Sequence, residues 1–338
     1  MRRVYVTGAG AVSAAGWGAS ALGQAVATNQ PLPVNDQERP GWAHPLRIRL
    51  VPAPSPRPAF FAHPRLRRVS PLTQYAAGAV LEAVAALPEA TRNGRLGLFC
   101  CLQSGTVQYA FRFFQETTAN PLTASPMLFP ETVFAAPASH ISSLLGRPVL
   151  AHTFMGDPAT FVQALALAAT HIAQGTLDAC VVVAAEESTW LHSDAMWHLD
   201  RTGVLSVGAG ALCLSAEPGP GHAVELLAVT DAHTYSSAKT IREAARAVRA
   251  QLPPGNPGEL LCDGLGGARL PHLAEAAAWQ DWPGARLSPK RVLGEGLTAG
   301  AAWQCVLAAR LLQAGAYRVA NVSVVGCNQQ SIGLRLGA

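Results

Sequence analysis

The strongest constraint on the fold is an alternation of short apolar runs with Ala-rich amphipathic stretches, which occurs twice along the chain. The first pass predicts strands at 3–7, 95–101, 179–187 and 208–216 and helices at 70–87 and 160–174. After the Pro/Gly segment at 217–221, the second pass predicts strands at 223–231, 259–263, 318–326 and 331–336 and helices at 238–252 and 299–315. The pattern therefore predicts an α/β protein with two similar layered halves, 1–217 and 222–338, each a sheet covered by helices.

One segment of the first half, HTFMGDPATFVQALALAATHIAQG at 152–175, predicts a strand, a sharp turn and a helix. Such a turn is a common place for a catalytic nucleophile. Here the turn holds Gly156, Asp157 and Pro158, so it contains no Ser, no Cys and no general base. The helix that follows is apolar nearly all round, which predicts that it is buried.

The composition places the chain among packed α/β proteins, since 49% of its 338 residues are hydrophobic and only 14% are charged. No apolar stretch reaches the roughly 20 residues needed to span a bilayer. The apolar run at the N-terminus is too short for a signal peptide, so we expect a cytoplasmic protein without a membrane segment. The formal net charge of +4 is too weak to indicate a nucleic-acid partner.

Several residue classes point away from cofactor and metal chemistry. GAGAVS at 8–13 resembles a dinucleotide-binding turn but has Ser13 where the third glycine is needed, so no such cofactor is predicted. The histidines are dispersed, and no metal site is predicted. Glu186 and Glu187 are adjacent on a predicted strand and point to opposite faces, so they are predicted to accept hydrogen bonds at the strand end rather than to form an acid/base pair.

The cysteine pattern indicates buried, reduced thiols. The count is odd, no Cys-x-x-Cys occurs and most cysteines stand in apolar runs. The seven are Cys100, Cys101, Cys180, Cys213, Cys262, Cys305 and Cys327.

A set of segments, taken in order, carries a family resemblance. They are RRVYVTGAGAVSAAG at 2–16, RLRRVSPLTQYAAGAVLEA at 65–83, LAATHIAQGTLDACVVVAAEES at 167–188, PKRVLGEGLTAGAAWQ at 289–304 and NVSVVGCNQQSIGLRL at 321–336. They resemble the β-ketoacyl synthases, enzymes of the thiolase fold. The resemblance covers nearly the whole chain and implies an α-β-α-β-α sandwich built from two similar halves.

The resemblance also locates the family's catalytic positions. The family uses a Cys at the start of a buried helix and two His residues, and counting from Gly146 and from Gly175 puts the nucleophile position at Pro158. The turn of the first His resembles CDGLGG and matches Asp263, and that of the second resembles GEGLTAG and matches Glu295. The family's Lys is retained as Lys290. The aromatic gate of its glycine-rich loop corresponds to Val325.

All three catalytic positions are changed, which argues against carbon–carbon condensation by this chain. Proline has neither a nucleophile nor an N–H, and two carboxylates would repel the enolate that the histidines stabilise. We expect an ion pair, either Lys290–Glu295 or Lys290–Asp263, to replace the catalytic electrostatics; if buried, such a pair is costly to half-remove.

The resemblance is nearest to the chain-length factor of bacterial aryl-polyene-type type II polyketide or fatty-acid systems. Such a subunit is inactive, pairs with an active β-ketoacyl synthase as a heterodimer and closes the acyl tunnel. The candidate tunnel or dimer residues, each with an ordinary core aromatic as the alternative, are Phe111, Phe113, Phe114, Phe129 and Phe134. The candidate contacts to an acidic acyl carrier protein, with a solvated face as the alternative, are Arg65, Arg67 and Arg68.

Two other functions stay open at the level of sequence. One is a thiolase-fold enzyme with changed chemistry, such as a decarboxylase, hydrolase or transacylase, that uses Asp263 or Glu295 as its acid/base group. The other is a homodimeric binding or scaffold protein that holds an acyl chain without acting on it.

Overall fold

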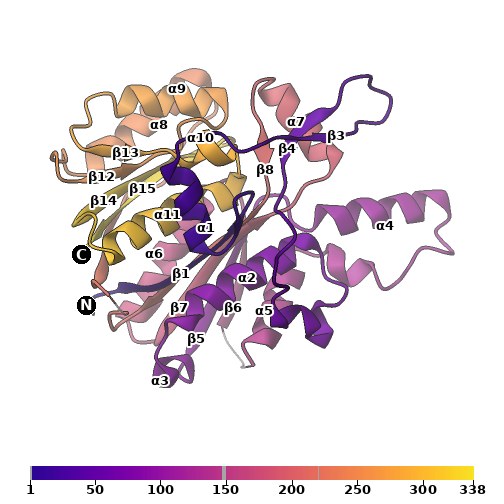
Figure 1. Cartoon of the computed structure of the whole chain (residues 1–338), viewed down its shortest axis with the longest axis horizontal. Helices are drawn as coiled ribbons and strands as arrows, with labels where there is room; N and C mark the ends of the chain where they lie inside the picture. Colours follow the sequence, from indigo (N-terminus) through magenta and orange to yellow (C-terminus); the bar gives the residue numbers. More distant parts are fainter. Residues whose placement is uncertain (1, 147–149, 220) are drawn as a thin grey trace.

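The computed structural model describes residues 2–146, 150–219 and 221–338. Its two halves repeat one strand arrangement around a pair of central helices (Figure 1). The predicted boundary at 217–222 falls between the last strand of the first half and the first strand of the second. Pro220, within that segment, lies outside the described residues.

The first half contains five main strands. They are β1 (Tyr5–Ser13), β5 (Leu96–Leu102), β6 (Leu150–Met155), β7 (Ala179–Glu186) and β9 (Gly208–Ser215). Their order in space is β6-β5-β7-β9-β1. The strands β5, β6 and β7 are parallel, whereas β9 is antiparallel to both β7 and β1.

The second half repeats this order with the same directions. Its strands are β10 (Val224–Val229), β12 (Leu260–Cys262), β13 (Ala285–Leu287), β14 (Val319–Val325) and β15 (Gln330–Gly337). Their order is β13-β12-β14-β15-β10. A short antiparallel pairing of β1 with β10, through Tyr5 and Val6, joins the two halves.

The helices form three layers, one between the halves and one on each outer face. In the middle, α6 (Thr160–Ala173) and α11 (Leu297–Gln313) pack on each other and on strands of both halves. Outside, α2 (Pro71–Ala85) and α5 (Ala136–Leu144) cover the first half, and α8 (Ala238–Gln251) and α9 (Arg269–Ala278) cover the second. The predicted α-β-α-β-α architecture is therefore confirmed.

Most elements predicted from periodicity are present within one or two residues. Ser70 accepts a hydrogen bond from the backbone N–H of Thr73 at the start of α2, as expected of an N-cap before Pro71. Ser237 forms a capping box with Thr240 at the start of α8. The central helices α6 and α11 are mostly buried, which explains why they are apolar nearly all round.

The prediction that the first strand ends at Gly8 was wrong, because β1 continues to Ser13. The glycines lie under α2 rather than in a turn. A Cβ on Gly8 would stand 1.9 Å from the carbonyl oxygen of Ala83, and one on Gly10 would stand 2.1 Å from that of Ala79. The GAG sequence therefore serves close packing of a strand against a helix.

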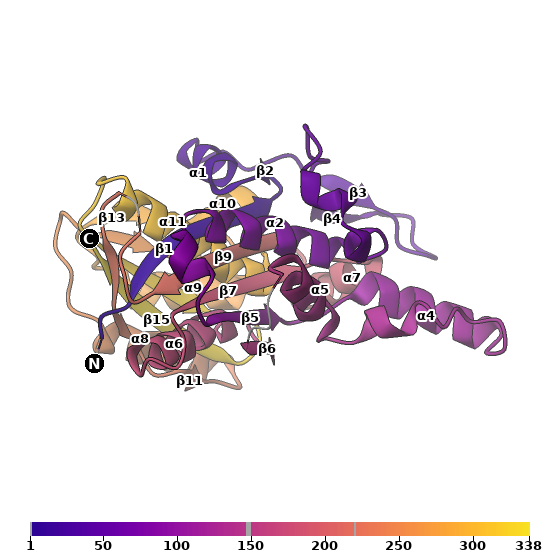
Figure 2. The same ribbon diagram turned by 90° about the horizontal axis from the view of Figure 1, so that it is seen from below.

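Other elements had no clear sequence signal. A small sheet contains β3 (Asn35–Gln37), β4 (Leu46–Arg49) and β8 (Leu205–Ser206) and lies beside α7 (Trp190–Leu199). Figure 2 shows α4 (Val107–Ala119) extending away from the body as an arm, and none of its residues is buried. The remaining short elements are β2 (Gly16–Trp17), α1 (Ala19–Ala27), α3 (Glu89–Arg92), β11 (His233–Thr234) and α10 (Pro289–Leu293), with three 3-10 helices, η1 (Ala59–Ala62), η2 (Pro64–Leu66) and η3 (Phe129–Thr132).

The described part of the chain shows how its apolar helices and its cysteines are placed. No helix there is long and apolar enough to cross a membrane. All seven cysteines are free thiols; six are buried, and Cys327 is partly exposed.

Candidate functional site

The site is built where the two central helices begin. Helix α6 follows the turn that contains Pro158, and helix α11 follows the turn that contains Glu295. Each helix connects the third and fourth strands of its own half, so the two turns occupy equivalent places in the repeated fold. The packing of α6 on α11 brings the two turns to the same region.

The first turn supplies a buried carboxylate rather than a nucleophile. Pro158 is buried and offers no side-chain or backbone donor. Beside it, Asp157 is 5% exposed, and its Oδ2 accepts hydrogen bonds from the backbone N–H groups of Asn328, Gln329 and Gln330 at 3.0, 2.7 and 3.4 Å. Three successive amides that point at one anion form the kind of backbone nest that binds negative groups. This nest is already filled by the chain's own carboxylate.

The loop at 326–330 is shaped for this contact. A Cβ on Gly326 would lie 1.8 Å from Oδ1 of Asp157, so only glycine fits there. The hydroxyl of Tyr235 donates to the carbonyl oxygen of Gly326 and holds the loop from the other side. Burial raises the pKa of Asp157 above its usual value, although the amide hydrogen bonds oppose that rise.

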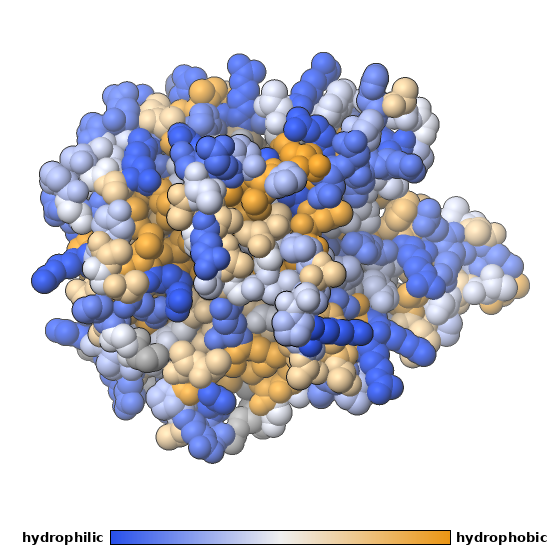
Figure 3. Space-filling model, viewed as in Figure 1, coloured by the Kyte–Doolittle hydropathy of each residue, from blue (hydrophilic) through white to orange (hydrophobic). Residues whose placement is uncertain are grey.

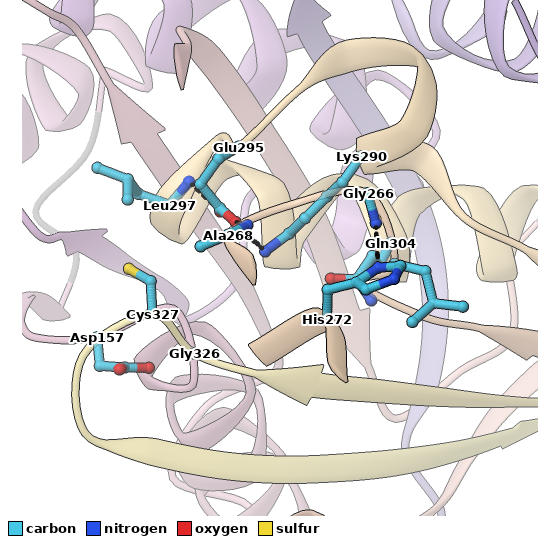
Figure 4. A network of polar contacts seen from close by, with 12 residues as sticks. Asp157, Gly266, Ala268, His272, Lys290, Glu295, Leu297, Gln304, Gly326 and Cys327 are labelled. Carbon is cyan, nitrogen blue, oxygen red and sulfur yellow. Dashed lines mark hydrogen bonds and ion pairs between the residues drawn. The ribbon is translucent and has the colours of Figure 1, made fainter. Parts of the chain in front are cut away.

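The second turn supplies a buried ion pair, shown in Figure 4. The ammonium of Lys290 lies 2.8 Å from each carboxylate oxygen of Glu295, and the two side chains are 2% and 1% exposed. The carboxylate also accepts the backbone N–H groups of Ala268 at 3.2 Å and Leu297 at 3.0 Å. Burial lowers the pKa of Lys290, but the adjacent carboxylate outweighs it, so the pKa is raised and the ammonium stays charged.

Asp263 takes no part in that pair. It is fully buried, and its carboxylate accepts from Arg286 Nε at 3.0 Å and from the hydroxyl of Ser288 at 2.5 Å. Of the two ion pairs expected for Lys290, the structure contains the one with Glu295. Sequence reasoning did not identify Arg286, which is 23 residues away from Asp263 and on the neighbouring strand β13.

The residue of the glycine-rich loop that faces the site is Cys327, not Val325. Val325 is 2% exposed and packs with Ile241 and Trp279 under the outer helices of the second half. Cys327 lies near Asp157 and Glu295 (Figure 4), and Gln103 Nε2 approaches its sulfur at 3.9 Å. Burial, followed by the charges of Glu295 and Asp157, raises the pKa of Cys327.

The two glutamates at the end of β7 are structural acceptors, as predicted. Glu186 accepts from the backbone N–H of Gln103 and from the hydroxyl of Thr298, and so ties β5 to α11. Glu187 accepts from the backbone N–H groups of Leu72 and Gln108. Burial raises the pKa of each carboxyl to about 7.

Four of the candidate phenylalanines lie outside the core, on α4 and the adjoining turn. The ring centres of Phe111 and Trp190 lie 6.1 Å apart, and those of Phe113 and Phe129 lie 5.6 Å apart. Phe114 is 66% exposed. In Figure 3 the arm shows apolar side chains among polar ones. A cavity of about 280 Å³ between α4 and α7 is lined by Phe111, Phe114, Leu191 and His192.

The other candidates lie closer to the body. Phe134 is partly buried, and its ring lies 2.8 Å from where a Cβ on Gly105 would stand. Arg65, Arg67 and Arg68 are all exposed in the segment before α2. The hydroxyl of Tyr109 on the arm donates to the carbonyl oxygen of Arg68 at 2.5 Å, so the arm contacts this basic segment.

Together these contacts define the charge state of the centre. Position 158 is proline, and burial raises the pKa of the nearby Cys327 thiol, which disfavours the thiolate. The ammonium and the amide nest of the centre are each satisfied by an internal carboxylate. Within the described ranges, no group of three or more His, Cys, Asp or Glu side chains is placed to hold a metal ion.

No protein-family model and no curated protein matches the sequence. Several solved structures match the fold of the chain. One is a type II polyketide synthase acyl-carrier protein in complex with its ketosynthase bound to the hexaketide. Its TM-score is 0.79 at 17% identity, over 100% of both chains. The ishigamide ketosynthase/chain length factor matches with a TM-score of 0.75 and 20% identity over 99% of both chains.

A third match is the ketosynthase ApeO in complex with its chain length factor ApeC from Xenorhabdus doucetiae. Its TM-score is 0.75 at 15% identity, over 100% of this chain and 98% of that chain. At such identities the likeness establishes the fold. The chain has the thiolase-type fold shared by ketosynthases and chain length factors.

Proposed function

We propose that this chain is a non-catalytic, chain-length-factor-type subunit that pairs with an active β-ketoacyl synthase as a heterodimer. In this proposal it works in the cytoplasm, in polyketide or polyene biosynthesis, and its side chains shape the partner's acyl tunnel. The observation that carries the proposal is the filled amide nest beside Pro158. Asp157 occupies the donors of the 326–330 loop, in a place where a condensing enzyme needs donors for its substrate.

The chemistry of thioester condensation explains why this arrangement is inactive. The reaction needs a thiolate and donors that stabilise negative charge on the thioester oxygen. Here Pro158 lacks a nucleophile and an N–H, and the carboxylates of Asp157 and Glu295 would oppose a developing anion. Lys290 cannot offset them, because its charge is already paired.

The exposed edge of the first half supports pairing with another subunit. Strand β6 is the last strand of its sheet, and no described strand bonds to its outer side. It exposes Leu150 and Met155, which are 39% and 59% accessible. An unpaired edge with apolar side chains is a template for another chain. The arm and the segment that follows it add exposed apolar residues, namely Phe114, Leu122, Met127, Phe129 and Val133.

The matched structures agree with this role in kind. Two of them are a ketosynthase with a chain length factor, and one is an acyl-carrier protein in complex with its ketosynthase. We propose that Arg65, Arg67 and Arg68 contact an acidic carrier protein, since all three are exposed. Phe111 and Phe114, at the cavity beside α4, are the proposed tunnel-shaping residues.

The geometry does not favour an enzyme that uses Asp263 or Glu295. A general acid/base carboxyl must reach the proton that it transfers. Asp263 is fully buried and engaged by Arg286 and Ser288, and Glu295 is 1% exposed and engaged by Lys290 and two amides.

Co-expression with a candidate ketosynthase tests the proposal. We expect a stable 1:1 heterodimer by size-exclusion chromatography with light scattering, and condensation of malonyl- and acyl-carrier-protein thioesters only when both chains are present. The chain alone is expected to be inert. The variant Met155→Asp/Phe129→Asp should abolish pairing, while Glu89→Gln on the exposed helix α3 should not.

Two results would overturn the proposal. One is thioester turnover by the lone chain that is lost with Asp263→Asn or Glu295→Gln, which would make it an independent enzyme. The other is full condensing activity of the ketosynthase with unchanged product length in the absence of this chain.

A further inference from the structure

A second pocket lies away from the central helices, between the loop joining β3 to β4 and the start of α7. Its volume is about 750 Å³, within the range of about 300–1,000 Å³ typical of ligand sites. The residues that line it include the acidic Asp36 and Glu38 and the aromatic Trp42 and Trp190. Asp36, Glu38 and Trp42 take no part in the site described above, whereas Trp190 also contacts the ring of Phe111 on α4.

The wall formed by the loop is held in place by α7. Arg39 pairs with Asp194 at 2.7 Å, and the hydroxyl of Ser193 donates to Oε1 of Gln37 at 2.5 Å. The rings of Trp42 and Trp197 pack edge to face, with their centres 5.1 Å apart. These contacts fix the loop backbone and the Trp42 ring before any ligand arrives, which reduces the ordering cost of binding.

The pocket carries unbalanced negative charge in a chain whose net charge is +4. Asp36 and Glu38 are exposed, and neither has an ion-pair or hydrogen-bond partner for its carboxylate among the described residues. The one basic residue of the lining, Arg39, is neutralised by Asp194. A cationic ligand would therefore complement both the charge and the aromatic rings.

The same place shows how such a ligand would be held. The guanidinium of Arg39 lies 3.4 Å from the centre of the Trp42 ring while it pairs with Asp194, and that of Arg201 lies 4.8 Å from the centre of the Trp197 ring. A planar guanidinium combines stacking on an indole with bonding to a carboxylate better than an ammonium does. Trp190 and the unpaired carboxylates of Asp36 and Glu38 line one pocket, so an indole and carboxylates are again available to a single guanidinium.

We propose that this pocket binds an arginine side chain presented by a partner protein, between the carboxylates of Asp36 and Glu38 and the ring of Trp190. The volume accommodates the guanidinium together with part of the backbone that carries it. This inference does not depend on the proposed pairing with a ketosynthase, because Asp36, Glu38 and Trp42 take no part in that proposal; only Trp190 borders it, through its contact with Phe111.

A blocked Gly-Arg-Arg-Gly peptide is the probe, titrated into ¹⁵N-labelled protein while the tryptophan indole N–H signals are followed. The signals are assigned with Trp42→Phe and Trp190→Phe variants. We expect saturable shifts of the Trp42 and Trp190 signals and at least tenfold weaker binding by Asp36→Asn/Glu38→Gln. The variant Glu89→Gln/Glu243→Gln, which changes the net charge equally at exposed positions elsewhere, should bind as the unmodified protein does.

Matched peptides with lysine or citrulline in place of arginine separate the contribution of the positive charge from that of the planar guanidinium. Weaker shifts with lysine and none with citrulline support a guanidinium site. The proposal fails if the arginine peptide gives no saturable shift up to about 10 mM, beyond the millimolar range of weak specific binding. It also fails if lysine binds equally well, or if Asp36→Asn/Glu38→Gln binds unchanged.

Discussion

The ammonium of Lys290 lies 2.8 Å from both carboxylate oxygens of Glu295, and hardly any of either side chain reaches solvent. A buried pair of this kind is costly to form and more costly to break on one side. Its presence at the start of α11 means that two charges with catalytic potential neutralise each other. The fold keeps a charged centre here, but one that is internally balanced.

Glu295→Ala should therefore destabilise the fold strongly. It leaves the Lys290 ammonium buried without a counter-charge, which costs about 3–5 kcal/mol. The measurement is the free energy of unfolding in denaturant at pH 7. The double variant Lys290→Met/Glu295→Leu should recover much of the loss, because no unpaired charge remains.

Glu243→Gln, which removes the surface pair with Lys239, is the control and should leave the unfolding midpoint unchanged. Equal midpoints for Glu295→Ala and the control would contradict the structural role.

A buried carboxyl beside this pair predicts an unusual pH dependence. Burial, together with the nearby charge of Asp263, raises the pKa of Glu275 from 4.5 to about 8. The folded protein therefore holds a proton that the unfolded chain releases between pH 4.5 and 8. The stabilising contribution is fully present below pH 4.5 and is lost as the pH rises through 8.

Glu275→Gln isolates that contribution, because the amide stays neutral and still accepts from the backbone N–H of Gly264. We expect the variant to match the unmodified protein in stability at pH 4 and to exceed it increasingly as the pH rises toward 9. Denaturant unfolding at pH 4, pH 6 and pH 9 checks this. A stability difference that does not change between pH 4 and pH 9 would contradict the assignment of a neutral carboxyl.

Removal of the Asp157 carboxylate should loosen one loop and little else. Asp157→Ala deprives the backbone N–H groups of Asn328, Gln329 and Gln330 of their shared acceptor. Because the side chains of Asn328 and Gln329 are exposed, we expect water to replace the carboxylate there. Hydrogen exchange at 328–330 should accelerate at least tenfold, while exchange in β14 stays slow.

The matched control for the loop is Asp231→Ala, since Asp231 accepts from Gln251 in an exposed turn of the same half. It should leave exchange at 328–330 unchanged. Uniformly faster exchange throughout the second half in Asp157→Ala would show that the carboxylate supports the whole half rather than the loop.

Periodicity was sufficient to predict the layers, because the buried strands and central helices are apolar and bounded by Gly, Pro or capping residues. Ser70 and Pro71 located a helix start to the residue. The arm α4 and the small β3-β4-β8 sheet had weaker signals, because they are polar on one side and packed through scattered contacts. The site partners Arg286 and Cys327 were missed for a related reason, since long-range register decides which loop residues meet.

The absence of Cys and His at the positions that match the family's catalytic residues was the most direct inference from sequence. The contacts that fill the centre could not be predicted. Asp157 stands directly before Pro158, which marks an acceptor at a helix start. Its Oδ1 does accept from the backbone N–H of Ala159 at 3.0 Å, but that its Oδ2 would also reach amides some 170 residues away depends on the packing of β15 against α6.

The final prediction concerns Pro158, which the proposed function equates with the nucleophile position of condensing enzymes. Pro158→Cys, made together with Cys327→Ser to remove the partly exposed thiol, should not create a condensing enzyme. The new thiol would lie beside the carboxylate of Asp157, with no free cation nearby, so its pKa should be raised and its thiolate scarce. We expect slow alkylation by iodoacetamide at pH 7.5 and no decarboxylation of malonyl thioester.

Adding Asp157→Ala should accelerate alkylation, because it removes the adjacent negative charge and frees the loop amides. Rapid alkylation of the thiol without that second change would show that Asp157 does not control the charge at this position.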